Sequence, residues 1–227
     1  MKKIFLFFFI FLFYIINNNF VNSSPTFDVT KLKASSETYQ IMIVIPYSYT
    51  SSQGRFYYYV KKDDGKWHEI INTECHIGAN GLGKEKEGDN KTPIGKFTFS
   101  SFFGINENPG TKMPYLQVND SIWWNCDSNS TGYNTMINKE YYTDDFDEDE
   151  SEHIIKYNPG YEYIMNINYN PDRIPRKGCA IFLHCFTKNF YTGGCVAISK
   201  ENMKKVIMTA NEKSVIIIDE LKNIYNY

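Results

Sequence analysis

Short apolar segments with the periodicity of β-strands recur along the chain, and this feature most constrains its fold. Residues 41–47 form a β-branched run around a proline, and residues 55–70 contain two alternating runs on either side of an Asp-Asp-Gly turn. The same reasoning predicts strands in the segments 95–102, 115–125 (with a turn at 119–120), 161–170, 178–185 and 214–219.

A single segment near the C-terminus has helix periodicity instead. Ser199 is a suitable N-cap, and Met203, Val206, Ile207 and Ala210 follow at the i, i+3, i+4 and i+7 spacing of one helix face. The aromatic content of 17% also fits a β-rich protein. The pattern therefore predicts a mainly β fold, a sandwich or a barrel, with one late α-helix.

The N-terminus indicates export. Two lysines precede an uninterrupted apolar run over residues 4–16, which is shorter than the roughly 20 residues that a bilayer core requires. This pattern is typical of a signal peptide, which we assign to residues 1–23. An uncleaved N-terminal anchor is the alternative. Residues 24–227 then form one domain, and we expect it to be secreted, without stable membrane insertion.

Charge excludes some partners. The net charge of −2 gives no basic surface for nucleic acid. The one marked charge run is the acidic segment 144–152, in which only Phe146 is apolar. We expect this segment to be a solvated loop whose shortening leaves stability nearly unchanged. The alternative is an acidic lip that attracts calcium or a cationic substrate.

Five cysteines leave an odd thiol in a chain expected to reach an oxidising compartment. In a strand over 178–185, alternation puts His184 on one face and both Cys179 and Cys185 on the other. Cys179 and Cys185 would also lie roughly 20 Å apart along the strand, too far to bond with each other. If Cys195 stays reduced, Cys75 and Cys126 complete an even set of four for two disulfides.

Cys195 is the expected partner of His184. It follows Gly193 and Gly194, whose turn can bring the chain back toward the histidine and leave backbone N–H groups uncovered. A thiol, an imidazole and free N–H groups are the components of nucleophilic acyl chemistry. We expect His184 to lower the thiol pKa, so that Cys195 alone is alkylated rapidly. A zinc site and a purely structural role remain alternatives.

Two segments resemble one known family. The span GCAIFLHCFTKNFYTGGCVAIS (178–199) resembles the catalytic signature of the L,D-transpeptidases, secreted enzymes that modify peptidoglycan. Upstream, EGDNKTPIGKFTFSSFFG (87–104) resembles the family's Gly-Asp and Thr-Pro-x-Gly segment. The resemblance covers roughly residues 40–220. Gly193 departs from the family pattern where many members have histidine, and Ala197 where many have arginine, which concerns the substrate-facing rim.

The resemblance implies a β-sandwich-like fold and a covalent mechanism. Cys195 would attack a stem carbonyl at an L-centre and release the terminal D-amino acid, and the thioester would pass to an amine or to water. His184 would move the protons, oriented by a backbone carbonyl such as that of Cys185. The N–H groups of Gly194 and Cys195 would hold the oxyanion, and Thr192 and Gly193 would lie on the substrate side.

The resemblance implies no metal and no organic cofactor. The expected partners are peptidoglycan peptide stems, and we expect a monomer that is secreted or associated with the cell wall. Two other classes of function remain open: a non-enzymatic wall-binding module that kept the fold, and an unrelated secreted cysteine hydrolase. An inert, buried Cys195 would favour the binding module.

Overall fold

The computed structural model describes residues 27–227, so the signal peptide expected at residues 1–23 lies outside the described residues. The strands are β1 (Gln40–Pro46), β2 (Gln53–Lys61), β3 (Trp67–His76), β4 (Gly95–Phe97), β5 (Phe99–Gly104), β6 (Tyr115–Gln117), β7 (Ile122–Asn125), β8 (Thr135–Asn138), β9 (Glu152–His153), β10 (Ile164–Ile167), β11 (Phe182–Cys185), β12 (Val196–Ile198) and β13 (Val215–Ile218). The helices are α1 (Lys200–Thr209) and the short 3-10 helices η1 (Val29–Lys31), η2 (Lys33–Ser36), η3 (Ile154–Lys156) and η4 (Leu221–Asn226).

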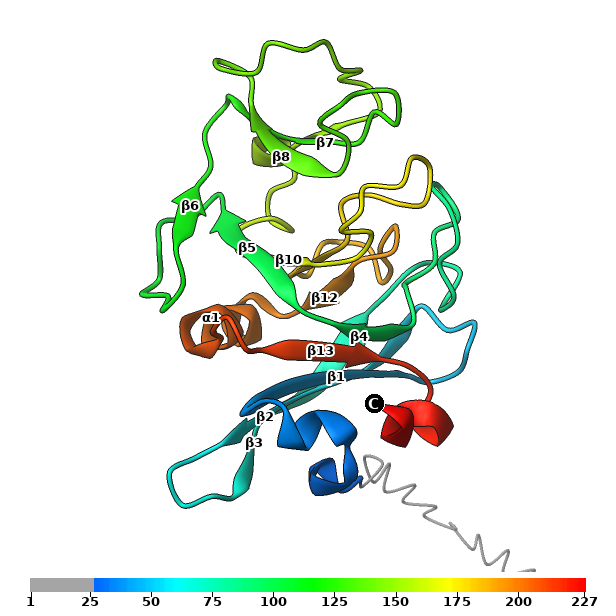
Figure 1. Ribbon diagram of the computed structural model, residues 1–227, viewed down its shortest axis with the longest axis vertical. Helices are drawn as coiled ribbons and strands as arrows, with labels where there is room; N and C mark the ends of the chain where they lie inside the picture. Colours follow the sequence, from blue (N-terminus) through cyan, green and yellow to red (C-terminus); the bar gives the residue numbers. More distant parts are fainter. Residues whose placement is uncertain (1–26) are drawn as a thin grey trace, which may run out of the picture.

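Ten strands form one sheet, in the order β4-β13-β1-β2-β3-β12-β11-β10-β5-β6. β4 and β5 lie near opposite ends of this order, yet only Thr98 separates them along the chain. One residue spans at most about 3.6 Å, so the two ends of the sheet lie next to each other. The sheet is therefore curled on itself (Figure 1), which confirms the mainly β, sandwich-like expectation.

Strand alternation in β1 sorts side chains onto two faces. Met42 and Val44 pack in the main core inside the curl, with side chains of β2, β11, β12, β13 and α1. Ile41, Ile43 and Ile45 face the other way and pack against η1, η2 and η4 near the two ends of the described chain. Both faces of this strand are buried, which explains why its sequence is a continuous apolar run rather than an alternating one.

The expected helix is confirmed in detail. The Ser199 hydroxyl accepts a hydrogen bond from the backbone N–H of Asn202, as an N-cap does. Met203, Val206 and Ile207 are fully buried in the main core. The helix follows β12 directly in the chain and covers one side of the curled sheet (Figure 1).

A second sheet has three strands, in the order β8-β7-β9, and we call residues 118–160 the small-sheet region. In Figure 1 it lies above the large sheet. Trp124 of β7 stacks on Phe103 with ring centroids 5.9 Å apart, and contacts Phe182 of β11 edge-on at 5.0 Å. This aromatic contact fixes the small sheet against the strand that carries His184.

Three strand predictions were wrong in their extent. Segment 95–102 is not one strand, because Thr98 separates β4, which pairs with β13, from β5, which pairs with β10. Segment 161–170 is a strand only over β10, whereas segment 115–125 does hold two strands around a turn, as expected, although in different sheets. Segment 178–185 becomes a strand only at Phe182, because Ala180 has a φ of 52°, in the left-handed region. Long-range pairing overrode the local periodicity in each case.

Within residues 27–227, none of the helices combines the length and the apolar character needed to cross a bilayer.

Candidate active site

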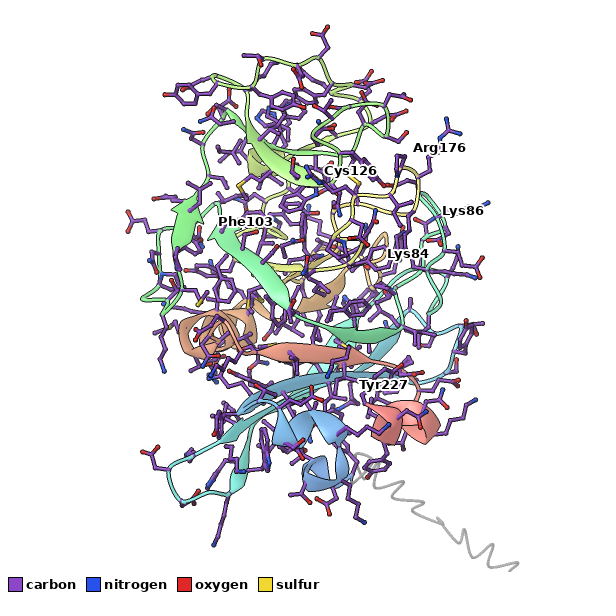
Figure 2. All side chains as sticks on the ribbon, in the orientation of Figure 1. Lys84, Lys86, Phe103, Cys126, Arg176 and Tyr227 are labelled. Atoms are coloured by element: carbon purple, nitrogen blue, oxygen red, sulfur yellow. A yellow bond between two sulfur atoms is a disulfide. The ribbon has the colours of Figure 1, made fainter. Side chains whose placement is uncertain are left out.

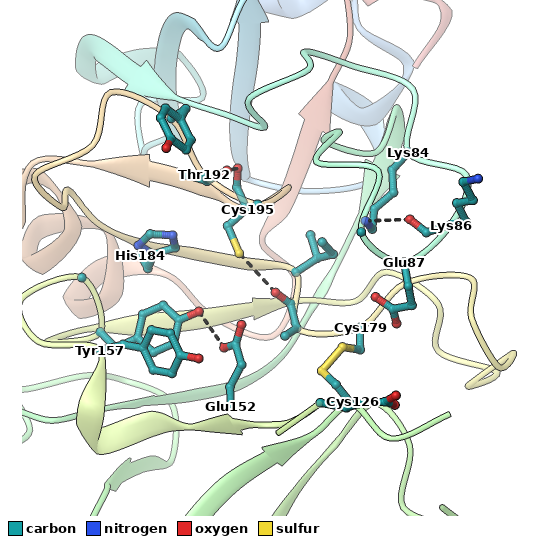
Figure 3. Close-up of a pocket in the computed structure, with 18 of the residues that line it drawn as sticks. Lys84, Lys86, Glu87, Cys126, Glu152, Tyr157, Cys179, His184, Thr192 and Cys195 are labelled. Carbon is teal, nitrogen blue, oxygen red and sulfur yellow. Dashed lines mark hydrogen bonds between the residues drawn. A yellow bond between two sulfur atoms is a disulfide. The ribbon is translucent and has the colours of Figure 1, made fainter. Parts of the chain in front are cut away.

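His184 and Cys195 come from two adjacent parallel strands. β11 and β12 pair in parallel, with Leu183 opposite Val196 and His184 opposite Ala197. Cys195 therefore lies immediately before β12, at the end of the loop that returns from β11. Both side chains line one pocket of about 850 Å³, together with Thr192 and Gly193. The structure thus brings the expected nucleophile and base to one cavity (Figure 3).

The Cys195 thiol is buried and hydrogen-bonded to the backbone where β11 begins. Its Sγ donates to the carbonyl oxygen of Ala180 at 3.1 Å and accepts from the N–H of Phe182 at 3.3 Å. Burial raises the pKa of the thiol to about 12. The expectation of a lowered thiol pKa was therefore wrong, because burial and then the charge of Glu152 raise the pKa, so the resting sulfur is protonated.

His184 is oriented as the resemblance implied. Its Nδ1 lies 2.7 Å from the carbonyl oxygen of Cys185. Because a carbonyl only accepts, Nδ1 carries the hydrogen and Nε2 is left as a base. Burial lowers the pKa of His184 to about 4, and the ring of Tyr161 packs against it edge-on at 5.2 Å. The resting pair at neutral pH is therefore a neutral thiol and a neutral imidazole.

The loop before Cys195 is braced by two threonine hydroxyls. Thr192 Oγ1 donates to the carbonyl oxygen of Cys195 at 2.7 Å and accepts from the N–H of Gly194 at 3.1 Å. Thr92 Oγ1 also lies 3.4 Å from that Cys195 oxygen and accepts from the N–H of Gly78 at 2.8 Å. Thr192 thus fixes the turn, and the Gly194 N–H proposed for the oxyanion has a partner in the resting state.

Gly194 needs to be glycine for two reasons. Its φ of 142° lies in the region that side chains rarely adopt, and an added Cβ would lie 2.8 Å from the carbonyl oxygen of Lys91. Gly193 differs, because an added Cβ there would meet nothing within 4 Å. The tight turn therefore depends on the second glycine, while the first is open toward the pocket.

The upstream segment 87–104 also supports the loop that carries Cys195. Asp89 accepts hydrogen bonds from the backbone N–H groups of Glu85, Lys86 and Lys91, and pairs with Lys84 at 3.0 Å. Burial raises the pKa of Asp89, but these contacts together outweigh it and lower the pKa to about 2, so Asp89 stays ionised. Because Thr92 follows three residues later, this folded loop holds its hydroxyl against the Cys195 carbonyl.

One disulfide forms where two were expected. Cys126 of the small-sheet region is bonded to Cys179, while Cys75, Cys185 and Cys195 are free and buried. The second bridge was a wrong prediction, because β12 separates β3 from β11. Cys75 and Cys185 are therefore two strand spacings apart, about 10 Å, beyond the roughly 7 Å that a disulfide allows.

The acidic segment 144–152 is not wholly a solvated loop. Its last residues pack: Ser151 is buried, and Glu152 pairs with Trp124 in the small sheet. The Glu152 carboxylate accepts a hydrogen bond from Tyr161 at 2.7 Å and lines the pocket. Sequence reasoning missed Glu152 and Tyr161 as site residues. The only sequence feature that pointed toward Glu152 was the acidic segment, considered as a lip that attracts cations. Nothing in the sequence set Tyr161 apart from the other tyrosines.

No group of three or more His, Cys, Asp or Glu side chains within residues 27–227 is arranged to hold a metal ion. His76 is the other histidine close to the site, because Ala197 pairs with His76 on one side and His184 on the other. Its ring stacks on that of Phe186, with ring centroids 4.2 Å apart.

The L,D-transpeptidase catalytic domain (YkuD) family model matches residues 41–218. A search of curated proteins finds no match. Among solved structures, the helical cell shape determining protein Pgp2 from Campylobacter jejuni matches with 18% identity and a TM-score of 0.41, over 80% of this chain and 48% of the other.

Two further solved structures match at lower identity. An L,D-transpeptidase from Stackebrandtia nassauensis has 13% identity and a TM-score of 0.36, over 81% of this chain and 56% of its own. An L,D-transpeptidase from Mycobacterium smegmatis has 12% identity and a TM-score of 0.37, over 80% and 58%. The chain thus spans about half the length of these structures. By the family match over most of its length, the chain belongs to the L,D-transpeptidase catalytic domain family.

Proposed function

We propose that the protein is a secreted, cysteine-dependent acyl transferase that acts on peptidoglycan peptide stems. The observation that carries the proposal is the shared pocket of Cys195 and His184, with the imidazole oriented by the Cys185 carbonyl, in a chain of this family. Membership of the family argues against the third candidate, an unrelated cysteine hydrolase. The single disulfide among the described residues supports an oxidising compartment.

In the proposed acylation, Cys195 attacks the carbonyl at the L-centre while His184 Nε2 takes the thiol proton. Because the pKa of the thiol is raised and that of the imidazole is lowered, we expect the proton to move as the sulfur attacks rather than beforehand. The thiol must first turn from the Ala180 carbonyl toward His184. The imidazolium then protonates the departing amine of the D-amino acid, which leaves a thioester.

The oxyanion would be held by backbone N–H groups at the turn before β12. Gly194 and Cys195 are the proposed donors, each worth about 10²–10³ in rate. The Gly194 N–H would exchange its present partner, the Thr192 hydroxyl, for the oxyanion. In the second half, an amine or water attacks the thioester, His184 takes a proton from it, and the Cys195 thiol is restored.

A wall-binding module without activity remains the second candidate, and one observation favours it. Cys195 is only 7% exposed, and burial raises its pKa, which is the state expected of an inert thiol. In an enzyme, substrate binding must release this thiol from the Ala180 carbonyl. The two candidates therefore differ in turnover and not in affinity for the wall.

Purified peptidoglycan separates the two candidates. We expect the mature protein to release D-amino acids and to change the mass spectrum of the muropeptides, through new cross-links or shortened stems. Cys195→Ala should bind the wall equally well and change nothing. Equal binding without any mass change in the wild-type protein would contradict the enzyme and support the binding module.

A further inference from the structure

We propose that Glu152, held by Tyr161, is the subsite that receives the cationic amine of the acyl acceptor. This inference rests on the proposed function and deepens it, by assigning the second substrate to one wall of the pocket. Glu152 is contributed by the small-sheet region, and Figure 3 shows its carboxylate directed toward the same space as the thiol of Cys195.

Only one oxygen of the Glu152 carboxylate has a hydrogen-bond partner within the described residues. Oε2 accepts the Tyr161 hydroxyl at 2.7 Å, whereas none of the hydrogen bonds or ion pairs found within residues 27–227 involves Oε1. A carboxylate inside a pocket is costly unless a cation or hydrogen-bond donors compensate it. The ammonium group of a ligand would supply both a positive charge and hydrogen-bond donors to Oε1.

Glu152 is also placed rigidly relative to the nucleophile. The backbone N–H of Cys126 donates to Ser151 Oγ at 3.1 Å, which fixes the residue before Glu152. Cys126 is bonded to Cys179, and the next residue, Ala180, offers the carbonyl that holds the Cys195 thiol. One short covalent and hydrogen-bonded path therefore joins the carboxylate to the sulfur.

The pocket is also lined by two exposed cationic side chains, with the acidic Glu87 next to one of them. Lys86 and Arg176 line the pocket and are exposed, and both lie on one edge of the molecule (Figure 2). Lys84 is already paired with Asp89 and is not available. The acyl donor loses a D-amino acid that carries a carboxylate, which the Lys86 and Arg176 side would attract. The acceptor brings an ammonium group, which fits the Glu152 side.

The chemistry balances without a further reactant. An ammonium group that binds at Glu152 gives one proton to the carboxylate and becomes a nucleophilic amine. The amine nitrogen forms a bond to the thioester carbonyl and passes its second proton to His184. The tetrahedral intermediate then expels the Cys195 thiolate, which recovers that proton from the imidazolium. The protonated Glu152 releases its proton to water.

Titration of Glu152 is set by its neighbours. Burial raises its pKa to about 7, the Tyr161 hydrogen bond lowers it, and the charge of Glu87 raises it. Tyr157 and Cys195 also face it, because its charge raises the pKa of each of them. Acceptor-dependent turnover should therefore increase as the pH rises through about 7, and Tyr161→Phe should move that increase to higher pH.

The test compares two acceptors on a preformed acyl-enzyme. A synthetic tetrapeptide stem acylates the wild-type protein, and the thioester is then offered either a stem with a free side-chain ammonium or hydroxylamine, which is uncharged at neutral pH. Glu152→Gln keeps the size of the side chain and an oxygen that can accept the hydrogen bond from the Tyr161 hydroxyl. Glu148→Gln is the matched control, because Glu148 lies in the same acidic segment, pairs with Lys139 and does not line the pocket.

We expect Glu152→Gln to lower transfer to the ammonium acceptor by about 10²-fold. Acylation, hydrolysis and transfer to hydroxylamine should stay within about twofold, and Glu152→Asp should restore part of the loss. Unchanged transfer to the ammonium acceptor would overturn the subsite. An equal loss in all four reactions would also overturn it, by showing a structural role. If the wild-type protein forms no acyl-enzyme, the proposed function itself fails, which is a distinguishable outcome.

Discussion

Two regions meet at the pocket, and they differ in origin and in what they contribute. The strand pair β11 and β12 belongs to the large curled sheet and carries His184 and the loop that ends in Cys195. The small-sheet region supplies Glu152 and half of the disulfide, and its chain continues into Tyr161. The first region contains the groups that we propose for acylation, and the second builds the wall that we assign to the acceptor.

The difference also appears in burial and charge. Cys195 and His184 are held neutral by burial, which raises the pKa of the first and lowers that of the second. The same burial raises the pKa of Glu152 only to about 7, so its charge changes near neutral pH. We infer that the strand pair is poised for concerted proton transfer, whereas the small-sheet region adds a pH-dependent charge.

The largest effect is expected from His184→Ala, which removes the group that we propose as the base of both half-reactions. General acid–base catalysis typically contributes a factor of about 10²–10⁴ to the rate. We expect the rate of D-amino acid release near neutral pH to fall by at least that factor. In the wild-type protein, the rate should fall when the pH drops through about 4, where the imidazole becomes protonated. A variant that kept its rate would show that another group is the base.

Loss of the Cys126–Cys179 disulfide tests the link between the two regions. Such bridges typically contribute about 2–4 kcal/mol to the free energy of unfolding, and we expect Cys126→Ser with Cys179→Ser to lower the melting temperature accordingly. Reductant should lower the melting temperature of the wild-type protein and leave the double variant unchanged. A comparable reductant effect on both proteins would mean that another bond is the stabilising one.

The Gly-Gly turn offers a comparison within the strand pair itself. Gly194→Ala forces a side chain into a positive φ and against the Lys91 carbonyl, which should cost about 1–3 kcal/mol of stability. Gly193→Ala meets no atom within 4 Å and should leave the melting temperature nearly unchanged. Thermal denaturation of the two variants decides this, and equal shifts would show that the turn is not built as described.

The smallest effect is expected in the exposed part of the acidic segment. Neutralising Asp145, Glu148 and Asp149 together should change stability by no more than about 0.5 kcal/mol. Ser151→Ala should cost more, about 1–3 kcal/mol, because the buried Cys126 N–H would lose its acceptor. Denaturant titration compares the two, and a larger effect from the triple variant would show that the charges themselves stabilise the fold.

The same contrast explains what the sequence could predict. The sequence pattern identified β1, β2, β3, β13 and α1, because a continuous β-branched run, alternation or helical spacing marks each of them. His184 and Cys195 were identified because a strand, a glycine turn and two reactive side chains lie within a few residues. The Cys185 carbonyl that orients the imidazole was also anticipated.

The small-sheet region was not predictable in the same way. β8 and β9 have four and two residues, too few to show a period, and β9 pairs with a strand far away in sequence. The thiol pKa was misjudged, because the contacts that bury Cys195, with Ala180 and Phe182, depend on the left-handed turn at Ala180. Alternation within one strand also gave no sign that β12 would separate Cys75 from Cys185.

The central claim is that Cys195 is the nucleophile of an acyl transfer for which His184 supplies the base. Incubation with a β-lactam of the carbapenem type, followed by intact mass measurement and peptide mapping, tests this most directly. We expect a single adduct on Cys195 in the wild-type protein, slow formation in His184→Ala and none in Cys195→Ala. A wild-type protein that remains unmodified, or that carries the adduct at Cys185 or Cys75, would contradict the account.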